Sequence, residues 1–180
     1  YEIAACLVGS EMCIRDSRGW LDQPQGLRIL CLASAGGQQA PVLAAAGAHV
    51  TVFDASEKQL DQDRRVAARD GLALQAVQGD MRDLSAFDDA SFDVVFHPIS
   101  NLYVPDVRPV WRECHRVLRR GGRLLSSFYN PIVFVGDRDP AYAKQGVIRP
   151  AYALPYADTR DLDSAALDAK LARGEAVVFG

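Results

Sequence analysis

A run of small residues follows a short apolar segment near the start of the chain. Residues 29–39 read ILCLASAGGQQ. The small residues of this run are Ala33, Ser34, Ala35, Gly36 and Gly37. Small side chains let a ligand approach the backbone closely, glycine readily adopts positive φ, and a helix that follows offers free N–H groups. The pattern predicts a strand, a tight turn and a helix around a nucleotide, although close packing of a strand on a helix favours the same residues.

Polar side chains also stand at the ends of three later apolar runs. They are Asp54 with Ala55, Asp80 with Met81, and His97 with Ser100 beyond it. An acidic side chain at the end of the second strand can accept hydrogen bonds from both hydroxyls of a ribose. A carboxylate beside a methionine can bind the exocyclic amine of adenine while the sulfur-bearing side chain covers the ring. These residue types therefore suit a ligand that contains adenosine.

Each of these residues also has a simpler explanation. Asp54 could be a favourable charge at a helix N-terminus. Asp80 could cap a turn, and His97 could be a hydrogen-bonded structural histidine. However, the carboxyl ends of parallel strands meet in one crevice, and ligands bind there in open α/β sheets. The coincidence of these residues at successive strand ends therefore favours a common site.

Apolar and amphipathic periods place the polar residues on alternating strands and helices. The expected strands are 27–33, 49–55, 72–79, 92–98 and 123–129, and the expected helices are 38–47, 56–71 and 106–119. Ser56 and Gln59 have the spacing of a capping box at the start of the second helix, and Gly71 stands at its end. Strands separated by helices predict an α/β fold, with a mostly parallel sheet covered by helices on both faces.

The two ends of the chain differ in character from this pattern. Residues 1–17 show no helix or strand period, and CLVGSEMCIRDS resembles translated sequencing-adapter read-through, so this segment is expected to be non-native. A secretory signal and a genuine N-terminal arm are the alternatives. Residues 131–162 have weak periodicity, 164–173 predict a short helix and 175–180 a strand. We expect 131–180 to be a truncated substrate-facing insertion or lid, with the last strands of the sheet missing.

Composition limits the kind of partner. The chain has 180 residues, a net charge of −3 and no basic excess, so neither nucleic acid nor an anionic membrane surface is an expected partner. No apolar run approaches the roughly 18–20 residues of a membrane span. The four cysteines form no C-x-x-C pair, which disfavours a zinc ribbon. Cys31 and Cys114 are expected to be buried thiols in a reducing compartment, which indicates the cytoplasm.

The order of these motifs resembles that of class I S-adenosylmethionine-dependent methyltransferases. After ILCLASAGGQQ, the resemblance rests on VTVFDASEKQL, VQGDMRDL, DASFDVVFHP and VWRECHRVLRRGGRLLSSF, and it covers residues 27–130. It implies a Rossmann-like methyltransferase fold, with an S-adenosylmethionine-binding domain over residues 18–130. A small-molecule methyl acceptor would be the partner, and the oligomeric state is not predicted.

The resemblance also implies a role for each candidate residue. The ribose would be held by Asp54, and Ala55 would line the adenine. Asp80 and Met81 would contact the adenine amine and ring. The turn from Ala33 to Gly37 would face the methionine part of the cofactor, and the segment from His97 to Ser100 would surround the methyl group.

The first motif departs from the family pattern at three positions. Cys31 stands where the family usually has an acid, and Ala33 and Ala35 stand where it has glycines. Alanine is expected to fit this turn only where φ is negative.

Methyl transfer is an in-line displacement from an activated leaving group, so alignment of the reactants is the main requirement and no metal is needed. The catalytic residues are not predicted, although His97 is a candidate general base. One alternative is a non-catalytic adenosyl-binding protein. An NAD(P)-dependent oxidoreductase is disfavoured, because both G-x-G-x-x-G and Tyr-x-x-x-Lys are absent.

Overall fold

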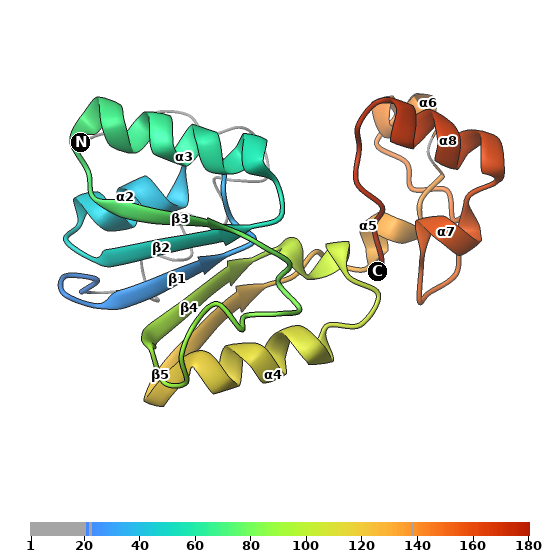
Figure 1. Cartoon of the computed structure of the whole chain (residues 1–180). Helices are drawn as coiled ribbons and strands as arrows, with labels where there is room; N and C mark the ends of the chain where they lie inside the picture. Colours follow the sequence, from blue (N-terminus) through green and yellow to red (C-terminus); the bar gives the residue numbers. More distant parts are fainter. Residues whose placement is uncertain (1–20, 22, 138) are drawn as a thin grey trace. The chain divides into compact units, whose positions relative to one another are not determined.

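The computed structural model describes residue 21, residues 23–137 and residues 139–180 (Figure 1). The expected non-native segment 1–17 lies outside these residues. The chain forms two compact units. The first holds the described residues up to Ser100 together with Val107–Ser127, and the second holds Asn101–Asp106 together with Phe128–Gly180.

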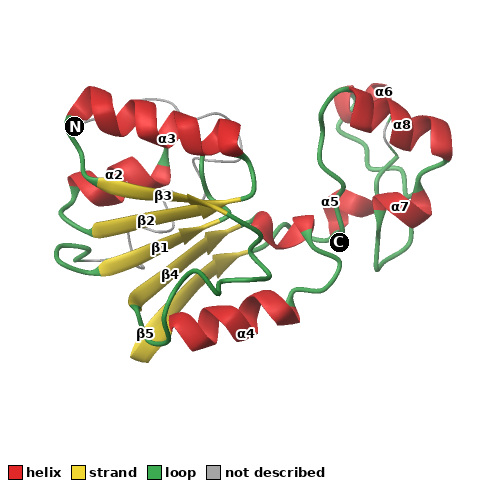
Figure 2. Ribbon diagram, in the orientation of Figure 1, coloured by secondary structure: helices red, strands yellow, loops and turns green. Residues whose placement is uncertain are grey.

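The first unit is built on a five-stranded parallel sheet. Its strands are β1 (Arg28–Leu32), β2 (His49–Asp54), β3 (Leu74–Gln78), β4 (Phe92–Pro98) and β5 (Leu118–Ser127). They lie in the order β3-β2-β1-β4-β5, and every neighbouring pair is parallel (Figure 2). The predicted parallel α/β sheet is confirmed. Because the strand order reverses between β1 and β4, the crevice for a ligand opens at the carboxyl ends of these two strands.

Helices cover both faces of this sheet. Helices α2 (Gln39–Ala45) and α3 (Glu57–Asp70) lie on one face, and α4 (Arg108–Val117) lies on the other (Figure 2). The Gln59 amide donates to Ser56 Oγ at the start of α3, and Gly71 ends the helix with φ +64°. Both signals were expected from the sequence. Within the described part of the chain, no helix is long and apolar enough to cross a membrane.

The start of β5 differs from the prediction. The sequence predicts a helix over 106–119 and a strand over 123–129, and the Gly121-Gly122 pair between them indicates the end of the helix. Instead α4 ends at Val117, and β5 begins at once with Leu118 and passes through both glycines. The register with β4 shifts here, Gly121 has φ +78°, and a Cβ on Gly122 would lie 2.9 Å from the Arg119 carbonyl oxygen. The glycines therefore form an irregularity inside the strand, where Gly121 adopts a left-handed φ and a side chain at Gly122 would not fit.

Arg116 on α4 holds the loop between β3 and β4. Its Nη atoms donate to the carbonyl oxygens of Phe87 and Leu84, at 2.9 and 2.8 Å. The same guanidinium pairs with Glu113 and Asp89, each at 2.8 Å, and these carboxylates raise the pKa of Arg116. The loop that follows Asp80 is thereby fixed to the helix.

The second unit contains short helices. They are α5 (Ile132–Val135), α6 (Pro140–Lys144), α7 (Asp158–Asp161) and α8 (Ser164–Ala172), and the 3-10 helix η1 (Ser100–Tyr103) bridges the boundary between the units. The short helix predicted over 164–173 is confirmed by α8.

The strand predicted over 175–180 is wrong. These residues form only an isolated antiparallel bridge between Phe179 and Ala157. Backbone hydrogen bonds join Gly180 to Tyr156 and Val178 to Asp158, and the buried carboxylate of Asp158 also accepts from the Val178 amide at 2.8 Å. The apolar run of this segment therefore packs without a neighbouring strand in the described structure.

Candidate functional site

The turn after β1 lies at the reversal of strand order. The Ala33 amide donates to the Phe53 carbonyl oxygen at 2.7 Å, which continues the pairing of β1 with β2. Ser100 Oγ donates to the Ala33 carbonyl oxygen. Ser100 is buried and lies just beyond β4, so two of the sequence-predicted positions are joined across the crevice.

The conformation of Ala33 corrects the expectation for this turn. Ala33 has φ +47°, in the left-handed region, whereas Ala35 lies outside it. Gly36 and Gly37 have φ values of +136° and +76°. A left-handed alanine costs about 1–2 kcal/mol because its Cβ crowds the backbone. Ala33 therefore adopts a backbone conformation that glycine usually occupies.

Replacing Ala33 by glycine should raise the free energy of unfolding by about 0.5 kcal/mol, since relief of the left-handed strain exceeds the added entropy of the unfolded chain. Ala35→Gly is the matched control. It relieves no such strain, so it should lower the same free energy by about 0.5–1 kcal/mol. Urea unfolding of both variants measures these changes, and an equal effect of the two substitutions would contradict the argument.

Two carboxylates accept hydrogen bonds from backbone amides of the turn after β1. Asp54 Oδ2 accepts from the Ala35 amide at 3.3 Å, and Asp63 Oδ2 accepts from the Gly36 amide at 2.8 Å. Asp54 ends β2 and was expected at the site. Asp63 belongs to α3 and was missed.

A signal for Asp63 was present in the sequence. It lies three residues after Leu60 and four before Ala67, on the buried face of α3, and is itself fully buried. A charged residue on the apolar stripe of a helix needs a partner. Burial raises the pKa of Asp63, the Gly36 and Gly37 amides lower it, and the charge of Asp54 adds a smaller upward effect.

The chemistry of Asp54 fits a ribose. Its Oδ1 accepts one hydrogen bond, from the Ser56 amide at 2.9 Å, and its Oδ2 accepts the one from Ala35. A carboxylate oxygen can accept about two hydrogen bonds, so with respect to the described residues each oxygen retains one acceptor position. Gly79 donates its amide to the Asp54 carbonyl oxygen at 3.0 Å, which brings the end of β3 beside it. Gln78 Nε2 likewise donates a hydrogen bond to the Ala55 carbonyl oxygen at 3.0 Å.

Asp80 is engaged by a neighbouring arginine. Arg82 Nε lies 3.0 Å from both carboxylate oxygens, Nη2 lies 2.5 Å from Oδ2, and the Arg82 amide donates to Oδ1 at 2.9 Å. These bonds lower the pKa of Asp80. An adenine amine could reach this carboxylate only after the arginine moves aside. Both side chains are about half exposed, so that movement is inexpensive. Met81 beside them is partly buried.

Comparison with known proteins identifies the family. The model of the methyltransferase domain family matches residues 30–126, which include β1 to β5 almost entirely. The chain belongs to the class I S-adenosylmethionine-dependent methyltransferases.

Relatives of this methyltransferase chain agree with that assignment. An uncharacterized methyltransferase, YbaJ of Bacillus subtilis, is 52% identical over 163 residues, covering 91% of this chain and 63% of the relative. A demethylmenaquinone methyltransferase of Clavibacter sepedonicus is 42% identical over 100 residues, covering 56% of this chain and 40% of the relative. The chain thus spans less than two thirds of the length of these curated relatives.

A solved structure shares the fold. The crystal structure of an S-adenosylmethionine-dependent methyltransferase from Mesorhizobium loti superposes with a TM-score of 0.60 at 21% identity. The match covers 92% of this chain and 94% of the other. The predicted Rossmann-like methyltransferase fold is confirmed.

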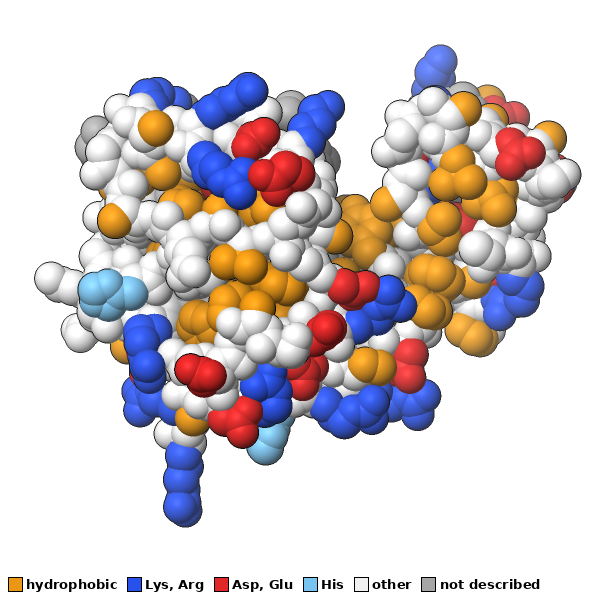
Figure 3. Space-filling view, viewed as in Figure 1, with side chains coloured by type: hydrophobic (Ala, Val, Ile, Leu, Met, Phe, Trp, Pro, Cys, Tyr) orange, Lys and Arg blue, Asp and Glu red, His pale blue; other side chains and the backbone are white. Residues whose placement is uncertain are grey.

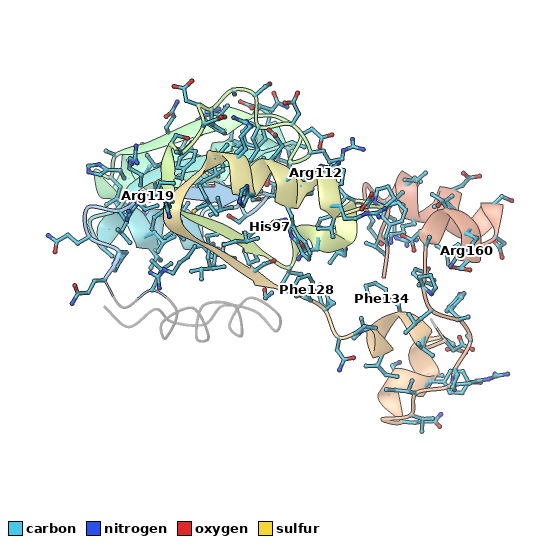
Figure 4. The ribbon with its side chains drawn as sticks, turned by 90° about the horizontal axis from the view of Figure 1, so that it is seen from below. His97, Arg112, Arg119, Phe128, Phe134 and Arg160 are labelled. Carbon is cyan, nitrogen blue, oxygen red and sulfur yellow. The ribbon has the colours of Figure 1, made fainter. Side chains whose placement is uncertain are left out.

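His97 lies inside the methyltransferase sheet rather than on its surface. It pairs in register with Ser126 on β5, and Figure 4 shows it well away from Arg119 near the start of that strand. Its side chain is 0% exposed, and neither ring nitrogen has a hydrogen-bond partner among the described residues. Burial lowers the pKa of His97 to about 4, so the ring is neutral at ordinary pH. The hydrogen-bonded structural role that the sequence left open therefore finds no partner in the described residues.

The two described cysteines are buried and free, as the sequence predicts. Burial raises the pKa of both thiols to about 12. Neither Cys31 nor Cys114 is therefore a nucleophile at neutral pH.

Proposed function

We propose that the chain binds S-adenosylmethionine at the carboxyl ends of β1, β2 and β3 and transfers its methyl group to a small-molecule acceptor. The observation that carries this proposal is the Asp54 carboxylate, which stands beside the turn after β1 with one acceptor position open on each oxygen. Two adjacent ribose hydroxyls match that donor requirement. Ala55, Asp80 and Met81 would then surround the adenine.

The chain mainly has to hold and align the reactants. When bound, the cofactor supplies a methyl group on a positively charged sulfonium. The turn from Ala33 to Gly37 would receive the methionine part, and its shape is set before binding by Asp54, Asp63 and Ser100. Pre-set geometry lowers the entropy cost of alignment. We retain the segment from His97 to Ser100 as the surroundings of the methyl group, but the fully buried ring of His97 is not placed to act as a general base.

The exposed side chains of the second unit favour an apolar methyl acceptor. This unit exposes large apolar side chains, at Phe128, Tyr129, Ile132, Val133, Val147, Ile148, Leu154 and Leu171. Apolar side chains also gather on the face of this unit that Figure 3 shows. Relatives of the chain include methyltransferases named for demethylmenaquinone, ubiquinone biosynthesis and sterols. We therefore propose that residues 131–180 face an apolar small molecule.

Calorimetry with S-adenosylmethionine and NAD tests the proposal. The chain should bind S-adenosylmethionine and not NAD, and Asp54→Asn should weaken binding by about 10–100-fold, the worth of hydrogen bonds to a charged group. Asp61→Asn on the exposed face of α3 removes the same charge and should change nothing. Binding of NAD alone would overturn the proposal. Binding without turnover on a broad panel of acceptors would favour a non-catalytic adenosyl-binding protein.

A further inference from the structure

Asp63 is a buried residue whose carboxylate contacts the backbone of the turn after β1. Its Oδ2 accepts from the Gly36 amide at 2.8 Å, and its side chain is 0% exposed. Its Oδ1 is also buried and has no hydrogen-bond partner among the described residues. Half of the acceptor capacity of this carboxylate is therefore unused within the described structure.

The negative charge of Asp63 is not required to hold the turn. A neutral side-chain oxygen could accept the Gly36 amide equally well, whereas burying an ionised carboxylate is costly unless a cation compensates it. In the described part of the chain, Asp63 forms no ion pair with a lysine or arginine. The groups that influence it most are the Gly36 and Gly37 amides and the carboxylate of Asp54.

Two acidic side chains therefore make the electrostatic potential around the turn negative. Asp54 and Asp63 hold successive amides, of Ala35 and Gly36, so two carboxylates lie within one turn of backbone. Cys31 beside them adds no further charge, because burial and Asp63 raise the pKa of its thiol to about 12 and keep it protonated. Two carboxylates without a lysine or arginine partner among the described residues favour a positively charged ligand at this turn.

We propose that Asp63 is a positioning and specificity-determining residue, whose carboxylate fixes the Gly36 amide and favours the charged cofactor over its neutral product. The inference rests on the proposed cofactor. S-adenosylmethionine carries a sulfonium charge, and methyl transfer leaves S-adenosylhomocysteine with an uncharged thioether. The two ligands are otherwise alike, so a charge beneath the turn distinguishes substrate from product and promotes product release.

The test compares both ligands on three proteins by calorimetry. These are the 180-residue chain, Asp63→Asn and the control Asp61→Asn, which removes an exposed carboxylate from the same helix. The asparagine oxygen can still accept from Gly36. Asp63→Asn should weaken binding of S-adenosylmethionine by about tenfold and that of S-adenosylhomocysteine much less, as the loss of one buried charge predicts. Asp61→Asn should leave the ratio of the two dissociation constants unchanged.

The possible outcomes separate the two proposals. An equal loss for both ligands would show a structural role alone, and no loss for either would show no role; both overturn the inference. A parent chain that binds neither ligand overturns the proposed function itself. Melting temperatures of each variant ensure that binding is measured on folded protein. If Asp63→Asn does not fold, Asp63→Glu keeps the charge and Asp63→Ser removes it, and only the serine variant should lose the preference for S-adenosylmethionine.

Discussion

Lowering the pH from 6.5 to 4 should reduce the free energy of unfolding by about 3 kcal/mol through His97 alone. The buried ring stays neutral in the folded protein because its pKa falls to about 4. In the unfolded chain the ring takes up a proton near pH 6.5. The folded-state pKa lies below the unfolded value, so this stability is fully present above pH 6.5. It is lost as the pH falls towards 4.

Urea unfolding at several pH values measures this effect as a difference between proteins. His97→Leu removes the titrating ring and its two unpartnered nitrogens, so the variant should lose less stability on acidification than the parent by about 3 kcal/mol. Identical acid slopes for the parent and His97→Leu would show that the ring is not a buried neutral group.

Gly79→Ala should lower the free energy of unfolding by about 2–3 kcal/mol, within the range for overpacked cores. A Cβ on Gly79 would lie 2.2 Å from Phe53 Cζ. The Phe53 ring is 2% exposed and meets the edge of Phe87 at a centroid distance of 5.4 Å, so it has little room to move. Gly79 precedes Asp80, so displacement of the ring should also disturb the proposed adenine contact.

A double mutant separates overpacking from other causes. Phe53→Leu should restore part of the stability of Gly79→Ala, because the shorter side chain leaves space for the new methyl group. Gly26→Ala is the control for the backbone effect of a glycine substitution. Its Cβ would meet nothing within 4 Å, so it should cost only the roughly 1 kcal/mol of a left-handed alanine. Equal losses for Gly79→Ala and Gly26→Ala would contradict the argument from space.

The parallel sheet could be predicted because its signals are local. Apolar runs such as residues 29–32, together with the capping pair Ser56 and Gln59, agree with the strands and helices that form. The positions of Asp54 and Asp80 followed from one rule about strand ends. The error at Gly121-Gly122 arose because two glycines indicate a break equally well between elements and inside a strand, and only pairing with β4 distinguishes the two cases.

The shape of the turn after β1 could not be predicted from local sequence. Ala33 adopts φ +47° because its amide is held by Phe53 and its carbonyl oxygen by Ser100, residues that lie far along the chain. Asp63 reaches Gly36 across 27 positions of sequence. Such contacts depend on how α3 packs over the sheet.

The guanidinium of Arg116 joins helix α4 to the loop between β3 and β4. All five of its N–H groups donate, to Glu113, Asp89 and the carbonyl oxygens of Phe87 and Leu84. Helix α4 in turn passes into β5 without an intervening loop. Opening the loop that carries Met81 therefore requires breaking several bonds at once. This loop, α4 and β5 should unfold and refold as one cooperative unit, so a ligand that orders the loop also protects the edge of the described sheet.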